Sequence, residues 1–450
     1  MTGRYQAYPE YKPSPIDWLE EIPSQWKTTR LKYLGNAIIG LTYSPDEVVE
    51  KESEDATLVL RSSNVQNGKI SLLDNVYVSK DIPEKLRTKK DDILICSRNG
   101  SRALIGKNAR IDDSSTNMTF GAFMTIFRSK YNEYLSHVFN SKLFEYQSGS
   151  FLTSTINQLT TGNLNSFEIP FPPEAELEPI NNFLNHETAK IDKLISKQEK
   201  LIELLKEKRQ AVISHAVTKG LRPDSEMKDS GIEWLGQVPK HWTVKKIKHF
   251  GAVIGGYAFK SSDFTDNGYP VIKISNVSHL EIDWSDRSYL PPDFAQRHKE
   301  YIAPKGSLVF AMTRPVISGG IKVFRMKDDS NPLINQRVGF INIENEDISF
   351  FILQSSLSSA FKAQFINNMT VTNQPNISGE GIGDICIAVP PQNELIEINL
   401  ALKNIGSLYS KLIENCIEQI GLMKERKTAL ISAAVTGKID VRNFKEEVNE

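Results

Sequence analysis

Polar and basic side chains that could hydrogen-bond to the edges of DNA bases recur at matching places in the two halves of this 450-residue chain. Arginine can donate two hydrogen bonds to guanine, and asparagine or glutamine can bind adenine through two bonds in the same way. Each of these side chains could equally be a solvated surface or turn residue. The candidates in the first half are Arg61, Ser63, Asn64, Arg98, Asn99, Arg102, Asn157 and Gln158, and those in the second half are Lys273, Asn276, Arg314, Gln336, Arg337, Asn373 and Gln374.

The residues that a self-contained enzyme would need are not apparent. The sequence has no G-x-x-x-x-G-K-[ST] phosphate loop and no Asn-Pro-Pro-aromatic tetrapeptide. Its seven histidines and three cysteines lack metal-ligand spacing, and the glycine cluster Gly379–Gly383 is predicted to be a turn. A Ser-His-Asp triad stays open, because its members need not be close in sequence. We therefore expect no catalytic residue, no metal site and no cofactor bound directly.

The charge of the chain is nearly balanced but unevenly distributed. The net charge is −1, yet residues 61–130 carry 13 Lys+Arg against 7 Asp+Glu, and residues 260–337 carry 11 against 9. A basic face on a neutral chain gives weak support for DNA binding. No apolar run approaches the ~18 residues that span a membrane, and the first ten residues lack an apolar signal core. With scattered cysteines, these features predict a cytoplasmic protein without a membrane segment.

The elements that would position the candidates occur twice. Residues Lys206–Thr218 and Lys424–Thr436 match at eight of thirteen positions without a gap, at an offset of 218. The stretch Ile16–Gly35 recurs as Ile232–Gly251, with its tryptophans and glycine in register. A repeat of this length indicates one large module used twice. We interpret the repeated tryptophans as anchors that pack each opening segment onto the domain after it.

Between these markers, each copy contains short β-like runs separated by turn residues. The order of the runs is the same in both copies, so that Arg61–Val65 corresponds to Lys273–Val277, and Asn157 and Gln158 correspond to Asn373 and Gln374. Each copy is long enough, at roughly 160 residues, to bury a core of its own. The pattern predicts two mixed α/β domains, an α+β chain overall.

A long helical pattern follows each domain, after Pro172-Pro173 and Pro390-Pro391. Its apolar residues follow a 3,4 spacing over about six heptads, which favours a coiled coil. Because neither helix can bury its stripe against one domain, we expect the two to pair antiparallel, with a pseudo-two-fold relation between the halves; packing on other subunits is the alternative. The expected a positions are Leu177, Leu184, Ile191, Gln198, Leu205, Val212, Leu395, Leu402, Tyr409, Cys416, Met423 and Leu430, and the expected d positions are Ile180, Glu187, Leu194, Leu201, Lys208, His215, Ile398, Ile405, Leu412, Gln419, Arg426 and Ala433.

The predicted division of the chain follows from these patterns. Residues 1–173 form the first domain with its tryptophan-containing segment, and 174–218 the central helix. Residues 219–391 form a linker and the second domain, and 392–450 the C-terminal helix and tail. The small side chains near the end of this last helix, Ala433 and Ala434, predict close packing beside a tryptophan-containing opening segment.

These features together resemble the specificity (S) subunit of type I restriction–modification enzymes, the HsdS family. The resemblance covers nearly the whole chain. It rests on two W-L-x-x-[IV]-P-x-x-W openings, at Trp18–Trp26 and Trp234–Trp242, on the two strand-Pro-Pro-helix junctions, and on the two repeated helix ends. The family often has Glu-Gln after the proline pair, and this chain has Glu176-Leu177 and Glu394-Leu395, so only the acid is kept.

The resemblance implies a subunit without catalytic activity of its own. Its two variable parts would be target recognition domains, each reading one half of a split, asymmetric site in double-stranded DNA, and its helices would set the spacer. Its partners would be two modification (M) subunits, which methylate adenine N6 with S-adenosylmethionine, and two restriction (R) subunits, which use ATP and Mg²⁺ for DNA cleavage.

Three rival interpretations follow from the residues alone. A fused methyltransferase–nuclease would need a cofactor fold and catalytic motifs. A DNA-binding adaptor or coiled-coil scaffold unrelated to restriction would not bind an M subunit. A subunit that serves only modification would have the same sequence features.

Overall fold

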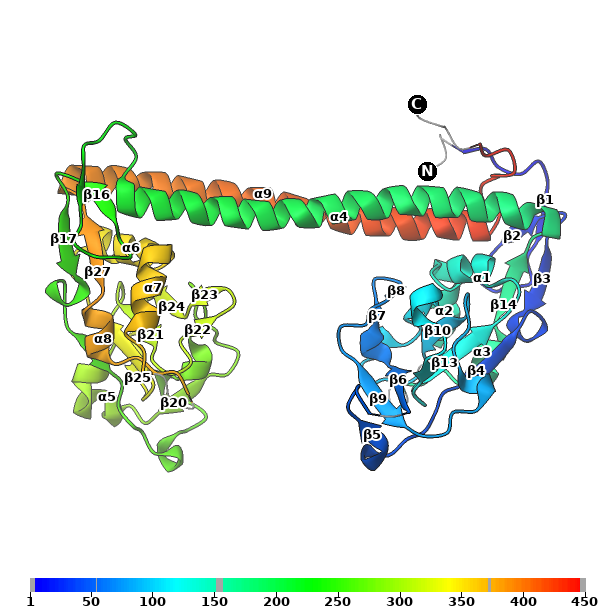
Figure 1. Ribbon diagram of the computed structural model, residues 1–450, viewed down its shortest axis with the longest axis horizontal. Coiled ribbons are helices and arrows are strands. Elements are labelled where there is room, and N and C mark those ends of the chain that lie inside the picture. The colour runs from blue at the N-terminus through cyan, green and yellow to red at the C-terminus, as the bar shows by residue number, and fades with distance from the viewer. Residues whose placement is uncertain (1–4, 54, 151–156, 371–373, 446–450) are drawn as a thin grey trace. The chain divides into compact units, whose positions relative to one another are not determined.

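A computed structural model describes residues 5–53, 55–150, 157–370 and 374–445 (Figure 1). The chain divides into two compact units. Unit 1 comprises Met1–Gln198 and Glu418–Glu450, and unit 2 comprises Glu199–Ile417. Each unit has mixed α/β content, which agrees with the predicted pair of mixed domains.

The core of unit 1 is built around strands whose residues are apolar on both faces. Ile93, Leu94, Ile95 and Cys96 are fully buried, because this strand lies inside a sheet covered on each side. Three helices are α1 (Asn132–Val138), α2 (Lys142–Ser150) and α3 (Thr161–Ser166). One sheet has the order β11 (Asn108–Arg110), β10 (Ile93–Cys96), β13 (Met124–Arg128), β4 (Asn36–Ile39), and the other has the order β12 (Thr119–Phe120), β6 (Ala56–Leu60), β9 (Val76–Ser79), β5 (Val48–Val49).

Unit 2 repeats this arrangement with its own strands and helices. In both units the four-stranded sheet is antiparallel, and the neighbouring sheet contains one parallel pair, β12 with β6 and β25 with β19. The elements are β24 (Val323–Arg325), β21 (Leu308–Ala311), β26 (Val338–Ile341) and β18 (Val253–Gly255) in one sheet, β20 (Ser288–Leu290), β19 (Tyr269–Ile272) and β25 (Leu333–Ile334) in the other, and helices α5 (Asp293–Arg297), α6 (Glu346–Ser355), α7 (Ser359–Asn367) and α8 (Gly379–Gly383).

Helix α8 corrects one expectation, because the glycine cluster forms a short helix where a turn was predicted. The Ser378 hydroxyl caps this helix by accepting a hydrogen bond from the Gly381 N–H at 2.9 Å. A Cβ at Gly379 would lie 2.8 Å from the Val253 carbonyl oxygen, so glycine allows the helix to approach β18 closely.

In each unit a buried tryptophan ties the opening segment to the start of a long helix. Trp26 and Trp242 are fully buried, and their indole Nε1 groups donate to Glu176 Oε2 at 2.9 Å and to Glu394 Oε2 at 3.1 Å. These bonds give the acid after each proline pair a structural role. The anchor prediction is wrong for Trp234, which is 41% exposed. The helices are α4 (Glu174–Lys219) and α9 (Gln392–Val435), preceded by the strand pairs β3 (Lys27–Arg30) with β14 (Glu168–Phe171) and β17 (Thr243–Lys246) with β27 (Cys386–Val389).

The end of α9 packs as expected beside the opening segment of unit 1. Ala434 is buried in the same apolar cluster as Trp26, which confirms that prediction. Gly437 follows the helix with a φ of 71°, and a Cβ there would lie 2.4 Å from the Pro23 ring. Only glycine fits both the left-handed backbone and the close contact.

The long helices bury a different stripe from the one predicted. The expected a positions lie on the covered side, but the middle d positions are wrong by one residue. Leu194 and Leu201 are 48% and 41% exposed, while Ile195 beside Leu194 is only 9% exposed. His215, expected to pack, is exposed. The covered residues with 4,3 spacing are Ile191, Ile195, Gln198, Ile202, Leu205 and Arg209 in α4, and Leu402, Gly406, Tyr409, Ile413, Cys416, Ile420, Met423 and Lys427 in α9.

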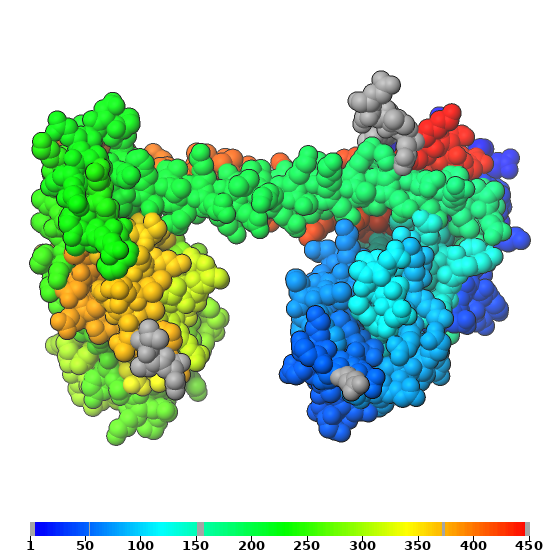
Figure 2. Space-filling view, in the orientation of Figure 1, coloured from blue at the N-terminus to red at the C-terminus, as the bar shows by residue number. Residues whose placement is uncertain are grey.

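Contacts between α4 and α9 within unit 1 run in opposite directions along the chain. The Lys427 ammonium lies 2.6 Å from the Asp192 carboxylate, and Gln198 Nε2 donates to Gln419 Oε1 at 2.9 Å. In unit 2 a Cβ at Gly406 would lie 3.8 Å from the Arg209 guanidinium. The side of α4 turned to the viewer in Figure 2 is not covered by other segments. No helix within the described ranges is long and apolar enough to cross a lipid bilayer.

Burial of His137 on α1 predicts a pH dependence of stability. Burial, with the nearby Arg110 and Lys427 charges, lowers the pKa of His137 from 6.5 to about 4. Between these two pH values the unfolded chain binds a proton that the folded chain does not, so stability falls as pH drops from 6.5 to 4. The full loss is about 3 kcal/mol.

Urea unfolding followed between pH 7 and pH 4 tests this expectation. His137→Leu should remove most of the slope, whereas His215→Gln, which removes an exposed histidine, should retain it. An unchanged slope in His137→Leu would contradict the assignment.

Candidate nucleic-acid interface

Each unit contains a 3-10 helix organised by a buried asparagine at its third position. The helices are η3 (Ser62–Asn64) and η9 (Ile274–Asn276). Asn64 Oδ1 accepts from the N–H of Arg61 at 2.9 Å, and Asn276 Oδ1 accepts from that of Lys273 at 2.8 Å. This bond fixes the backbone of the basic residue that precedes each helix.

The same two asparagines also hold the loop that follows. Asn64 Nδ2 donates to the carbonyl oxygens of Ser71 and Asp74, both at 3.0 Å, and Asn276 Nδ2 donates to Asp283 and Asp286 at 2.8 and 2.9 Å. Both side chains are 0% exposed, and their amide groups are occupied. The prediction that Asn64 and Asn276 contact DNA is therefore wrong, because neither amide can reach a base edge.

An acid that the sequence did not single out pairs with each basic residue. Arg61 lies 2.9 Å from Asp74, and Lys273 lies 2.9 Å from Asp286, thirteen residues further along in both cases. The hydrogen bond from Lys273 lowers the pKa of Asp286. The equal spacing was the available signal. Ser63, the remaining candidate here, has its hydroxyl buried without a hydrogen-bond partner in the described part of the chain.

The loop after β10 brings the other candidates of unit 1 together. Asn99 Nδ2 donates to the Ser62 hydroxyl at 3.3 Å, and Asn157 Nδ2 donates to the Gly100 carbonyl at 3.1 Å. Gln158 forms a backbone bridge with Arg98. Segments near residues 62, 99 and 157 thus form one surface. Arg102 is exposed, and its guanidinium donates to the Gly149 carbonyl at 3.4 Å.

Sequence reasoning missed an aromatic residue on this surface. The Arg98 guanidinium lies 5.1 Å from the centre of the Phe123 ring, and Phe123 is 58% exposed. An exposed aromatic ring beside a guanidinium offers stacking and cation–π contacts to a base or another ring. Its position beside the exposed Arg98 could not be read from spacing, because 25 residues separate the two.

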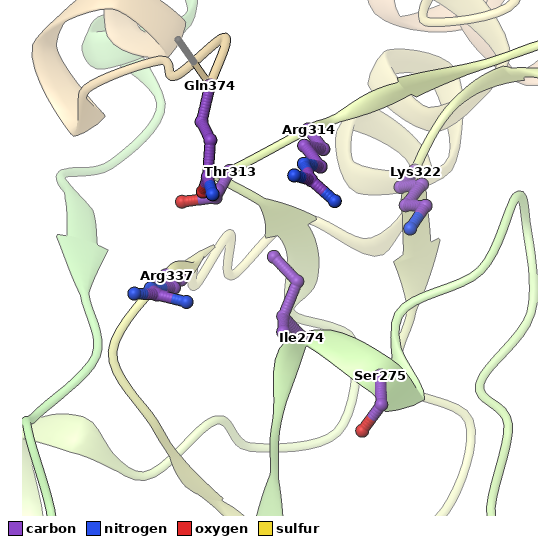
Figure 3. Close-up of a pocket in the computed structure, with 7 residues that line it drawn as sticks. All are labelled: Ile274, Ser275, Thr313, Arg314, Lys322, Arg337 and Gln374. Atoms are coloured by element: carbon purple, nitrogen blue, oxygen red, sulfur yellow. The ribbon is translucent and has the colours of Figure 1, made fainter.

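The candidates of unit 2 gather around a hollow of about 290 Å³ (Figure 3). Arg314, Arg337 and Gln374 line it, as does Lys322, which the sequence did not single out. Gln336 is exposed next to Arg337 but does not line the hollow, and Asn373 lies outside the described residues. The other residues that line it are Ile274, Ser275 and Thr313.

The hollow concentrates positive charge. Its basic side chains are Arg314, Lys322 and Arg337, and none of them has an ion-pair partner among the residues that the structure describes. Their charges are thus available to an anionic or electron-rich ligand. Within the described ranges, no group of three or more His, Cys, Asp and Glu side chains could hold a metal ion.

Comparison with known sequences identifies relatives over almost the whole length of the chain. The sequence profile of the type I restriction modification DNA specificity domain matches residues 23–213 and 239–422, more than half of the chain. The type I restriction enzyme MjaVIII specificity subunit of Methanocaldococcus jannaschii is 27% identical over 427 residues, which cover 94% of this chain and 95% of that protein. The EcoKI specificity subunit of Escherichia coli K12 is 23% identical over 436 residues, covering 93% and 90%.

A solved structure shares the fold. A chain from a type I R-M system, described for its complex assembly and conformational transition, aligns with a TM-score of 0.65 at 14% identity. The alignment covers 93% of this chain and 99% of that chain. At this identity the likeness concerns the fold alone.

Proposed function

The chain belongs to the family of type I restriction–modification DNA specificity subunits, and on this basis we propose that it selects the DNA sequence on which a multisubunit restriction–modification enzyme acts. The family membership carries this proposal. The basic hollow of unit 2 and the Arg98–Phe123 surface of unit 1 are the places where DNA contact is proposed.

Each unit is proposed to read one half of a split site. Equivalent elements carry the candidates in both units, since a basic residue precedes the asparagine-organised 3-10 helix in each. The side chains themselves differ, however, with Asn99 in the loop of unit 1 and Arg314 in the matching loop of unit 2. Different donors and acceptors select different bases, so two unrelated half-sequences and an asymmetric site are expected.

The helices α4 and α9 are proposed to form an antiparallel two-helix coiled coil that sets the spacer, with a pseudo-two-fold relation between the halves. The 4,3 spacing of covered residues and the opposed contacts at Asp192–Lys427 and Gln198–Gln419 support this. A continuous helix of 46 residues is about 69 Å long, enough to span two half-sites one turn of DNA apart.

Catalysis is proposed to lie in partner subunits. Two M subunits would methylate adenine N6 with S-adenosylmethionine, and two R subunits would use ATP and Mg²⁺. Exposed leucines on the long helices provide apolar area for such partners, because isolated apolar side chains in water gain from being covered. Leu400, Leu408 and Leu422 on α9 are 61%, 57% and 59% exposed.

Co-purification with an adenine-N6 methyltransferase subunit tests this assignment. The tagged chain should retain two M subunits, as measured by native mass spectrometry. Leu400→Asp with Leu408→Asp should weaken the complex, because each places a charge in an apolar contact. Leu221→Asp, at a 45% exposed leucine that follows α4, is the matched control and should bind normally. A wild-type chain that retains no M subunit would contradict the proposal.

A further inference from the structure

The hollow of unit 2 differs from the matching place in unit 1 in two decisive side chains. The loop after β10 has Asn99 where the loop after β21 has Arg314. Counting from the paired Asn117 and Asn335, Thr119 stands where unit 2 has Arg337. Thr119 is buried and donates to the Leu86 carbonyl, so it cannot act as a surface donor. Both guanidinium groups at the hollow are therefore particular to unit 2.

The third cation has a counterpart in unit 1. The Lys107 carbonyl accepts from the Cys96 N–H at 2.8 Å, and the Lys322 carbonyl accepts from the Ala311 N–H at 3.0 Å. A lysine at this position thus follows the strand pairing in both units. Arg314 and Arg337, by contrast, change the chemistry of the surface and carry the difference between the two units.

The backbone at both arginines is held in an uncommon conformation. Arg314 has a φ of 45° and Arg337 a φ of 70°, the left-handed region that side chains rarely adopt. Neighbouring strands fix it, since the Arg314 N–H donates to the Pro375 carbonyl at 2.8 Å and the Arg337 carbonyl accepts from the Met312 N–H at 2.7 Å. The guanidinium groups are thus presented from an ordered frame, as direct reading of a base requires.

Resting on the proposed function, we propose that the hollow receives the major-groove edge of a guanine in the half-site read by unit 2. The Arg314 and Arg337 guanidinium groups donate to guanine O6 and N7. Guanine presents two acceptors on this edge, whereas adenine presents one acceptor and one donor, and a donor would oppose a guanidinium.

The rest of the lining favours a base over a bare phosphate. Thr313 adds a hydroxyl that can donate or accept, and Ile274 adds an apolar surface, neither of which a phosphate needs. Lys322, a point charge on a flexible stem, suits a flanking phosphate. Figure 3 shows Arg314 and Lys322 on one side of Ile274 and Arg337 on another.

The test uses the full chain in complex with its M partner and a duplex that carries its mapped target. Each guanine of the half-site assigned to unit 2 is replaced in turn by 7-deazaguanine, which lacks the N7 acceptor. Fluorescence anisotropy gives the dissociation constants. At one position the wild-type complex should bind about 10-fold more weakly, because a charge-assisted hydrogen bond is lost.

Arginine variants show whether that loss passes through the hollow. Arg314→Ala and Arg337→Ala should weaken binding of the unmodified duplex about 10-fold to 100-fold and should lose their sensitivity to 7-deazaguanine there. Arg337→Lys keeps the charge but not the two-pronged donor and should behave like Arg337→Ala. Arg102→Ala removes the same charge from unit 1 and should stay sensitive. Retained M-subunit binding checks that each variant is folded.

The outcomes separate this inference from the proposed function. A wild-type complex that prefers its target but tolerates 7-deazaguanine at every guanine overturns the inference, as do variants that remain sensitive. Variants that lose affinity equally for all duplexes, with a shallower salt dependence, indicate a phosphate contact and also overturn it. A wild-type complex that binds no sequence better than random DNA contradicts the proposed function itself.

Discussion

Replacing Glu176 with alanine should lower the free energy of unfolding of unit 1 by about 3–5 kcal/mol, because a buried charged acceptor would be removed from three donors. Its carboxylate accepts from Trp26 Nε1 at 2.9 Å, from the Tyr8 hydroxyl at 2.9 Å and from Gln25 Nε2 at 3.1 Å. Glu176 is 8% exposed. Burial and the bond to Glu176 raise the pKa of Tyr8, so this hydroxyl remains a donor across the usual pH range.

Denaturant unfolding followed by tryptophan fluorescence measures the loss, with each transition fitted separately because two units need not unfold together. Glu178→Ala, two residues further along α4 at an exposed position, is the matched control and should change little. Glu394→Ala should have a smaller effect in unit 2, since Glu394 is less buried and has Trp242 and His241 as its partners. Equal stability of Glu176→Ala and Glu178→Ala would show that the tryptophan bond contributes nothing.

Lengthening both long helices by seven residues should widen the gap in the DNA target by about 3 base pairs, without changing either half-sequence. Seven residues add about 10.5 Å of helix, and each base pair occupies about 3.4 Å. The insertions belong after Ile195 in α4 and after Met423 in α9, between the contacts Asp192–Lys427 and Gln198–Gln419. A heptad keeps the 4,3 stripe in register.

The matched control inserts four residues, about one helical turn, after Ile195 alone. This insertion shifts the stripe of one helix against the other, so it should destabilise the pairing and lower methylation instead of producing a clean new spacer. Sequencing of methylated DNA from cells that express each variant with the M partner gives the gap directly. An unchanged gap in the double-heptad variant would contradict the role of the helices as a spacer.

The sequence predicted the large features well, since they rest on repetition and burial. Two mixed α/β domains followed from the repeated order of short runs, and tight packing at the end of α9 followed from Ala433 and Ala434. The d positions failed because Leu194 and Ile195 are adjacent and both apolar, as are Leu201 and Ile202. Spacings of 3,4 and 4,3 fit such pairs equally, and only packing shows which member is covered.

The candidate site was predicted at the level of segments and not of side chains. The matching runs at Arg61 and Lys273 do carry surface cations, but the most similar residues in them, Asn64 and Asn276, are buried organisers of the loop. A side chain kept identical between two surfaces that read different sequences has a structural role for the same reason. Phe123 and Lys322 were missed because their neighbours come from distant parts of the chain.

The central claim is that each unit reads its own half of one split DNA sequence. Sequencing of methylated adenines in a host that expresses this chain with its M subunit, and no other adenine methyltransferase, tests it most directly. The account predicts that every methylated site consists of two unrelated half-sequences separated by a gap of fixed length. A continuous palindrome at the methylated sites would contradict it.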